Sequence, residues 1–256
     1  SNHLGYDIFG AGQTMALAGY GDQIPFEPLV EVDPDRFNDF IINHDKTVFG
    51  MTDVPTFEGE DSEELIANPW VSLARQAQET LEEDILYLAW LARKKTKVKK
   101  LCLAGGVALN CIINQKLIES GTFDEIYIQP AASDEGLPLG CALSGYYANG
   151  GQERKHMSDA YLGVPNDPAT LPGVLDNWKL KGQNASPEEI AKLLADGKII
   201  GRVAGGSEYG PRALGNRSIL ADPRPADMKN RLNAEIKHRE GFRPFAPSCL
   251  EDNIPD

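Results

Sequence analysis

The sequence predicts an α/β protein, because two separate stretches of the chain alternate between strand-like and helix-like segments. Residues 101–148 read as strand, loop, helix, strand, loop and helix. Residues 186–237 contain a helix that opens with a capping box at residues 186–189, a strand, and a second helix over residues 225–237, and an extended segment follows at residues 242–249. A glycine-rich, polar segment at residues 149–159 separates the two stretches. The chain has 256 residues, enough for two ordinary domains, which we assign to residues 1–153 and 154–256.

A long helix is predicted before the first stretch. Asn68 can cap it, and Pro69 suits the first helical position. Lysines follow it, where the negative end of a helix favours positive charge. Further upstream, residues 10–18 predict a short helix and residues 21–60 predict irregular loops with a small hairpin. One face of the long helix is marked by apolar or small residues at helical spacing: Trp70, Ala74, Ala77, Leu81, Ile85, Leu88 and Ala92.

Two loops of the first stretch follow predicted strands, where α/β sheets bind their ligands. The strand at residues 101–104 runs into Gly105-Gly106 and then a helix that ends at Gly121, with Asn110 expected one turn inside it. Two glycines and a helix N-terminus suit a phosphate, so these residues are candidates for a nucleotide site. A tight turn without a ligand is the alternative, and both interpretations stay open.

The second loop, residues 130–136, follows the strand at residues 125–129 and precedes a helix over residues 137–148. Its Asp134 carries a hard carboxylate that can bind a divalent cation. Helix capping by Asp134 or Ser133 is the alternative. The two neighbouring loops together favour a site for a nucleotide and a metal.

The most informative segment is residues 208–247, which begins E-Y-G-P-R-A-L-G-N-R-S. Arginine presents a fixed fork of donors that fits phosphate and carboxylate oxygens. Gly210, Pro211 and Gly215 interrupt regular structure around the first two arginines and predict a shaped loop. The pattern fits either an oxyanion site or a salt-bridged surface. Although the chain has a formal net charge of −13, this segment holds six arginines: Arg212, Arg217, Arg224, Arg231, Arg239 and Arg243.

Composition excludes several classes of protein. No apolar run reaches the roughly 20 residues that a membrane-spanning helix needs, and no signal peptide is evident. The negative charge argues against general nucleic-acid binding. No cysteine or histidine cluster has zinc-ligand spacing. Cys102, Cys111 and Cys141 lie among apolar residues, which predicts buried thiols and a cytoplasmic location.

Three strings resemble one known family. A-G-G-V-A-L-N, F-D-E-I-Y-I-Q-P-A-A-S-D-E-G and Y-G-P-R-A-L-G-N-R-S-I-L-A-D-P-R, followed by F-R-P-F-A-P, are similar to the O-carbamoyltransferases of the nodulation (NodU) type and of cephamycin and tobramycin biosynthesis. These motifs are long and occur in the family's order, over residues 101–145 and 198–248. The weaker string G-A-G-Q-T-M-A-L-A-G-Y-G near the start fits the same family.

The resemblance implies the second half of an actin-like ATPase domain followed by an incomplete YrdC-like domain. In such enzymes, carbamoyl phosphate is activated with ATP to carbamoyl-adenylate, and the carbamoyl group passes to a hydroxyl of a sugar or natural product. A divalent metal, iron or magnesium, is implied, as is a possible homodimer. Carried over, Gly105, Gly106 and Asn110 would meet the nucleotide and Asp134 the metal. The activation site would be lined by Arg212, Asn216, Arg217 and Ser218.

Two departures from the family pattern bear on the expected activity. The H-x-x-x-H pair that would complete the metal site is missing, since His3, His44, His156 and His238 lack that spacing. The first half of the actin-like domain is also missing. The alternative to an active carbamoyltransferase is therefore a relative that binds nucleotide without turnover. A sugar- or acetate-kinase-like phosphotransferase is disfavoured, because such kinases lack the Y-G-P-R-A-L-G-N-R-S segment.

Overall fold

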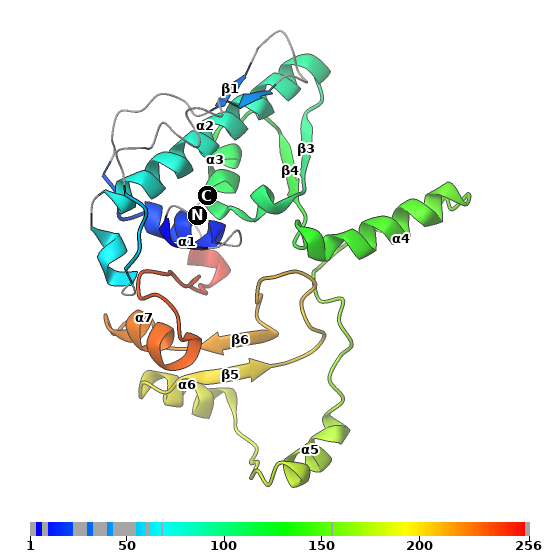
Figure 1. The fold of residues 1–256 in the computed structure, drawn as a ribbon. Helices are drawn as coiled ribbons and strands as arrows, with labels where there is room; N and C mark the ends of the chain where they lie inside the picture. The colour runs from blue at the N-terminus through cyan, green and yellow to red at the C-terminus, as the bar shows by residue number, and fades with distance from the viewer. Residues whose placement is uncertain are drawn as a thin grey trace. The chain divides into compact units, whose positions relative to one another are not determined.

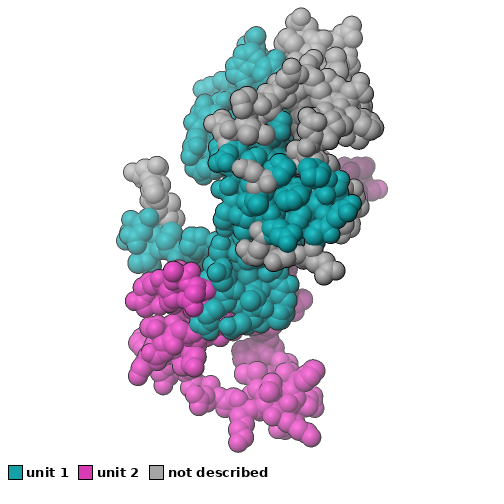
Figure 2. All heavy atoms as spheres, turned by 60° about the vertical axis from the view of Figure 1, so that its left-hand side comes forward, with its two compact units in different colours: residues 1–102, 110–127, 229–256 teal, residues 103–109, 128–228 magenta. Residues whose placement is uncertain are grey.

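The computed structural model describes residues 4–6, 10–22, 30–32, 40–42, 55–59, 62–67, 69–154 and 156–253 (Figure 1). They form a mixed α/β structure with three two-stranded sheets, which confirms the predicted class. Two compact units are present (Figure 2). Unit 1 comprises Ser1–Cys102, Asn110–Tyr127 and Lys229–Asp256, and unit 2 comprises Leu103–Leu109 and Ile128–Met228. The domain boundary at residues 153/154 stays a prediction.

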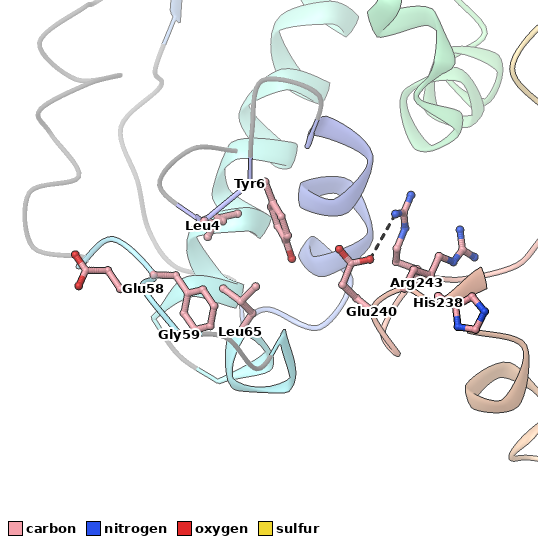
Figure 3. A pocket seen from close by; sticks show the side chains of 11 residues that line it. Leu4, Tyr6, Glu58, Gly59, Leu65, His238, Glu240 and Arg243 are labelled. Atoms are coloured by element: carbon pink, nitrogen blue, oxygen red, sulfur yellow. Dashed lines mark hydrogen bonds and ion pairs between the residues drawn. The ribbon is translucent and has the colours of Figure 1, made fainter. Parts of the chain in front are cut away.

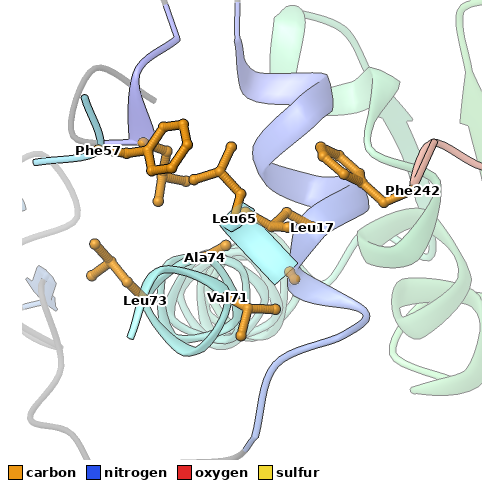
Figure 4. Packing of buried hydrophobic residues seen from close by; sticks show 9 residues of the cluster. Leu17, Phe57, Leu65, Val71, Leu73, Ala74 and Phe242 are labelled. Atoms are coloured by element: carbon orange, nitrogen blue, oxygen red, sulfur yellow. The ribbon is translucent and has the colours of Figure 1, made fainter. Parts of the chain in front are cut away.

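The core of unit 1 packs helix α1 (Ala11–Ala18) against the first turns of helix α2 (Trp70–Thr96) (Figure 4). Leu17, Ala74 and Phe242 are among its fully buried members, with relative exposures of 0–2%. The short helix predicted at residues 10–18 is thus confirmed. Phe242 comes from the F-R-P-F-A-P segment, so this part of the family motif contributes to the core. Beyond Phe242, residues 243–250 form no strand, and only their predicted extended character remains.

Helix α2 begins one residue later than predicted, at Trp70, with Pro69 as its N-cap. Asn68 lies outside the described residues. The helix ends at Thr96, after a last turn that contains Arg93, Lys94 and Lys95, and the left-handed φ of 61° at Lys97, its C-cap, turns the chain. This position of the basic residues is the one expected from the helix dipole.

The buried face of α2 differs from the predicted apolar face, of which only Ala74 is fully buried. Four polar side chains of α2 are also buried, with exposures of 4–7%: Ser72, Gln78, Thr80 and Glu82. Gln78 and Glu82 bond to one another and to residues of the next helix, which explains their burial. Apolar spacing alone could not predict that partners would be available for them.

Strands β3 (Lys100–Leu103) and β4 (Glu125–Ile128) form the predicted pair, joined by helix α3 (Cys111–Glu119). Their hydrogen bonds join Asp124 N to Lys99 O at 2.9 Å and Gln129 N to Leu103 O at 3.3 Å, so the strands run in the same direction. Gly121 follows α3 with a φ of +60°, as predicted. Helix α4 (Leu137–Ala148) has the predicted bounds.

Asn110 does not lie inside a helix, contrary to the prediction. A 3-10 turn (Gly106–Leu109) comes first, and Asn110 then caps α3. Its Oδ1 accepts hydrogen bonds from Ile112 N and Ile113 N at 3.2 and 3.3 Å. These bonds satisfy main-chain donors at the start of α3, which is why the helix begins after Asn110.

In unit 2, helices α5 (Leu171–Asn177) and α6 (Pro187–Ala195) precede strand β5 (Ile200–Val203). The predicted capping box of α6 is confirmed: Glu189 N donates to Ser186 Oγ, and Ser186 N donates to Glu189 Oε2. Strand β6 (Arg217–Leu220) pairs antiparallel with β5, with Ile200 opposite Leu220 and Val203 opposite Arg217. The sequence had indicated a loop at Arg217.

Two remaining segments also bear on the predictions. Helix α7 (Met228–Arg231) continues as a π-helical turn (Leu232–Lys237), so the helix predicted from residue 225 begins later. Strands β1 (Val30–Val32) and β2 (Phe40–Ile42) pair antiparallel, which confirms the small hairpin.

All four cysteines are exposed, so the prediction of buried thiols was wrong. No helix within the described ranges is long and apolar enough to cross a membrane.

Candidate anion-binding site

Three loops of unit 2 are linked by hydrogen bonds that join the second of them in the sequence to each of the other two. We name them the glycine loop (residues 105–109), the aspartate loop (residues 130–136) and the arginine loop (residues 204–217). Gly105 N donates to Ala132 O at 2.6 Å, which joins the glycine loop to the aspartate loop. Tyr209 Oη donates to Glu135 O at 2.7 Å, which joins the arginine loop to the aspartate loop. The structure therefore brings together motifs that are about 100 residues apart in the sequence.

A carboxylate shapes the arginine loop from within. Glu208 Oε1 accepts hydrogen bonds from three main-chain N–H groups: Leu214 at 2.8 Å, Asn216 at 2.8 Å and Arg217 at 3.2 Å. Desolvation raises the pKa of Glu208, but these main-chain donors outweigh it and lower the pKa to about 2. Converging N–H groups of this kind form a concavity that favours negative charge. The arginine loop therefore folds around the carboxylate of Glu208, an anion of the chain itself.

Three of the predicted site residues hold the same loop in shape. Asn216 Nδ2 donates to Gly206 O at 2.8 Å, and Ser218 Oγ accepts from Gly215 N at 3.0 Å. Arg217 donates from Nη1 to Ala204 O and Asn216 O, both at 2.7 Å, and from Nη2 to Gly205 O at 3.4 Å. Because a guanidinium carries five N–H donors, Arg217 retains donors for a ligand even with these bonds formed.

Arg212 differs from Arg217. It lies at the exposed tip of the arginine loop, and within the described ranges no hydrogen bond or ion pair engages its guanidinium. Its five N–H donors are therefore available to an incoming anion. The structure thus separates the two arginines, which the sequence could not distinguish: Arg217 mainly supports the loop, and Arg212 is presented by it.

The glycine and aspartate loops present main chain and one exposed carboxylate. Gly105 has a φ of +99°, and a Cβ placed on Gly106 would lie 3.6 Å from Ser133 Oγ. Asp134 begins a 3-10 turn (Asp134–Gly136), and its side chain is exposed. Within the described ranges, no group of three or more His, Cys, Asp or Glu side chains is placed to hold a metal ion. One carboxylate does not make a metal site by itself, so the residues present do not fit the metal.

Asn110 is mostly engaged elsewhere. Besides capping α3, it donates from Nδ2 to Gln78 Oε1 at 2.9 Å, and Gln78 Nε2 donates to Glu82 Oε1 at 2.6 Å. Lys116 completes this network through an ion pair with Glu82. Asn110 belongs to unit 1, whereas Gly105 and Gly106 belong to unit 2. Its predicted contact with a nucleotide stays a prediction, and its observed role is structural.

The six arginines are divided between the two units: Arg212, Arg217 and Arg224 belong to unit 2, and Arg231, Arg239 and Arg243 belong to unit 1. Arg224 pairs with Asp222 at 2.6 Å and Arg231 with Glu235 at 3.5 Å, as the salt-bridged alternative predicted. Arg239 and Arg243 line a cavity of about 700 Å³ in unit 1, together with Tyr6, Phe57, His238 and Glu240, and Arg243 Nη1 also pairs with Glu240 Oε2 at 3.4 Å (Figure 3). Burial first and the Glu240 carboxylate second raise the pKa of Tyr6 to about 12, against a smaller lowering by Arg243. The sequence had not predicted this cavity.

Sequence reasoning also missed Glu208 and Tyr209, although both stand in the motif that drew attention to the arginines. A carboxylate close to two arginines is more often an ion-pair partner, and nothing in the spacing indicated that Glu208 would bind main-chain N–H groups. Tyr209 had no sequence signal, because its partner, Glu135 O, is a main-chain atom of a distant loop.

Two family profiles match the residues of these loops. The profile described as carbamoyltransferase N-terminus matches residues 11–143, and that described as carbamoyltransferase C-terminus matches residues 191–256. The first match includes the glycine and aspartate loops, and the second includes the arginine loop. Together they extend over most of the chain.

Curated relatives carry nodulation names. The chain is 38% identical over 261 residues to nodulation protein NolNO of Sinorhizobium fredii, covering 98% of this chain and 38% of that protein. It is 48% identical over 185 residues to nodulation protein NolO of Bradyrhizobium diazoefficiens, covering 70% of this chain and 34% of that protein. Nodulation protein U of Azorhizobium caulinodans is 38% identical over 199 residues, with coverages of 77% and 33%. The chain thus spans about a third of the length of these relatives, and it belongs to the carbamoyltransferase family.

Proposed function

We propose that this chain is part of an ATP-dependent O-carbamoyltransferase. In the proposed reaction, carbamoyl phosphate is activated with ATP to carbamoyl-adenylate, and the carbamoyl group then passes to a hydroxyl of a sugar or natural product. The observation that carries the proposal is the arginine loop, which hydrogen bonds hold in shape. The loop exposes Arg212, whose guanidinium no hydrogen bond or ion pair engages within the described ranges.

The chemistry of activation explains why such a loop would be needed. Carbamoyl phosphate and ATP bring many negative oxygens into one place, and loss of pyrophosphate develops further charge. Fixed guanidinium donors stabilise that charge without any transfer of protons. Arg212 would bind these oxygens directly, and Arg217 would add its remaining donors. Asn216 and Ser218 would keep the loop in the shape that the reaction requires.

The finer architecture and setting are also part of the proposal. We assign residues 1–153 to the second half of an actin-like ATPase domain and residues 154–256 to a YrdC-like domain. Gly105 and Gly106 would face the nucleotide, and a cytoplasmic location would supply ATP. Asp134 would bind a divalent metal, iron or magnesium, only if further ligands joined it. No step of the reaction is assigned to the metal.

Transfer to the acceptor requires the hydroxyl and the activated carbamoyl group to be held together. An actin-like fold makes that site between two halves, and the resemblance assigns only the second half to these residues. We therefore expect this chain alone to carbamoylate no acceptor in a panel of sugars and aminoglycosides. The steps that can be assayed with this chain are the binding of ATP and carbamoyl phosphate and the activation of carbamoyl phosphate.

Mass spectrometry can test activation directly. The chain is incubated with ATP and carbamoyl phosphate, with a control that omits carbamoyl phosphate, and the mixture is analysed for carbamoyl-adenylate and pyrophosphate. Formation of both only in the complete mixture supports the proposal. Binding of ATP without any adenylate would favour the alternative, a nucleotide-binding relative without turnover. Absence of binding and of adenylate would reject both.

A further inference from the structure

Tyr209 and Gly210 hold the arginine loop against both ends of the aspartate loop. The Tyr209 hydroxyl donates to Glu135 O near the end of the aspartate loop, at 2.7 Å. Gly210 lies against its beginning, since a Cβ on Gly210 would come within 2.7 Å of Pro130 O. Tyr209 N also donates to Ala160 O at 2.7 Å, which fixes the main chain at the same point. Two consecutive residues therefore set the separation of the two loops.

The residue before them fixes the arginine loop to itself. Glu208 Oε1 accepts three main-chain hydrogen bonds from the returning arm of the loop, at Leu214, Asn216 and Arg217. Arg212 stands between these two anchors in the sequence, two residues after Gly210 and two before Leu214. A displacement of Arg212 on anion binding would therefore be transmitted to Tyr209, and through its hydroxyl to the aspartate loop.

We propose that Tyr209 is a positioning residue that couples the arginine loop to the aspartate loop. Through it, an anion bound at Arg212 alters the main chain around Glu135 and so the placement of Asp134. The coupling part of this inference rests on the proposed function, because it requires an anion at Arg212. The positioning part does not, because the hydrogen bond is present without any ligand.

The chain offers a closely matched control. Tyr161 Oη donates to Leu214 O, also at 2.7 Å, and Tyr161 likewise lies in unit 2. This hydrogen bond joins Tyr161 to the arginine loop, and no residue of the aspartate loop takes part in it. Tyr209→Phe and Tyr161→Phe each remove one phenolic hydrogen bond to a carbonyl group of unit 2. Only the first change removes a bond between the two loops.

The experiment measures amide hydrogen exchange by NMR, residue by residue, with and without carbamoyl phosphate. In the absence of ligand, Tyr209→Phe should speed exchange at Glu135 and Gly136 by about 2- to 12-fold, as expected for the loss of one hydrogen bond. Tyr161→Phe should leave these two amides unchanged. With carbamoyl phosphate, the wild-type chain and Tyr161→Phe should show slower exchange in both loops. Tyr209→Phe should show this slower exchange in the arginine loop alone.

Each other outcome has a definite meaning. Unchanged exchange at Glu135 and Gly136 in Tyr209→Phe would overturn the positioning role. A wild-type response confined to the arginine loop would overturn the coupling. If carbamoyl phosphate changes neither loop of the wild-type chain, the proposed function fails and the coupling fails with it. The ligand-free comparison then still decides whether Tyr209 positions the aspartate loop.

Discussion

Replacement of Gly210 by alanine tests the contact between the arginine and aspartate loops through stability. Gly210 has a φ of +131°, and the added Cβ would lie 2.7 Å from Pro130 O and 3.0 Å from Pro130 C. The backbone conformation alone makes any side chain unfavourable, at a cost of about 1–3 kcal/mol. The contact with Pro130 adds a second penalty of about 1–3 kcal/mol, because main-chain atoms cannot rotate away as a flexible side chain can.

Gly215→Ala separates the two penalties. Gly215 lies in the same loop with a φ of +114°, but the nearest atom to an added Cβ is Tyr161 Oη, at 4.0 Å. Both variants therefore suffer from the backbone conformation, and only Gly210→Ala meets Pro130. Urea unfolding followed by circular dichroism should show Gly210→Ala to be less stable than Gly215→Ala by about 1–3 kcal/mol. Equal free energies of unfolding would refute the packing of the arginine loop on Pro130.

Three further predictions concern charge, a buried network and self-association. Because main-chain hydrogen bonds lower the pKa of Glu208 from 4.5 to about 2, the contribution of its carboxylate to stability is present above pH 4.5 and is lost as the pH falls toward 2. The urea midpoints of Glu208→Gln and the wild-type chain should therefore differ above pH 4.5 and converge near pH 2. A difference that stays constant with pH would contradict this. Lys116→Met should lower the free energy of unfolding by about 1–3 kcal/mol, because the buried carboxylate of Glu82, which is 4% exposed, then loses its ion pair. An unchanged urea midpoint would show that the ion pair contributes nothing to stability. Helix α4 has no buried residue and exposes Leu137, Leu143 and Tyr146. The chain should therefore self-associate with rising concentration in analytical ultracentrifugation, and Leu143→Glu should weaken that association. A monomer at all concentrations would contradict the prediction of self-association.

The elements that could be predicted from the sequence are those with strong local signals. The α6 capping box, the bounds of α4 and the left-handed glycine after α3 all depend on residues close together in the chain. The parallel pairing of β3 with β4 also followed, because the connecting helix leaves few other arrangements. The position of the arginine motif was evident for a similar reason, since its glycines, proline and arginines are adjacent.

What could not be predicted depends on partners far away in the sequence. Arg217 begins a strand because β5 provides the pairing, although its neighbours are typical of a loop. Gln78 and Glu82 are buried because Asn110 and Lys116 come from another helix. The division of labour between Arg212 and Arg217 arises from the positions of carbonyl oxygens in the folded loop, which no residue pattern encodes directly.

Calorimetric titration with carbamoyl phosphate and with ATP tests the central claim, that Arg212 is the residue through which the arginine loop binds an anion. Loss of a charge-assisted hydrogen bond costs about 1.5–3 kcal/mol, which corresponds to a roughly 10- to 100-fold loss of affinity. Arg212→Ala should therefore bind at least one ligand about 10- to 100-fold more weakly than the wild-type chain. Arg154→Ala, which removes another exposed arginine of unit 2, should bind both ligands with wild-type affinity. Wild-type affinity of Arg212→Ala for both carbamoyl phosphate and ATP would contradict the assignment.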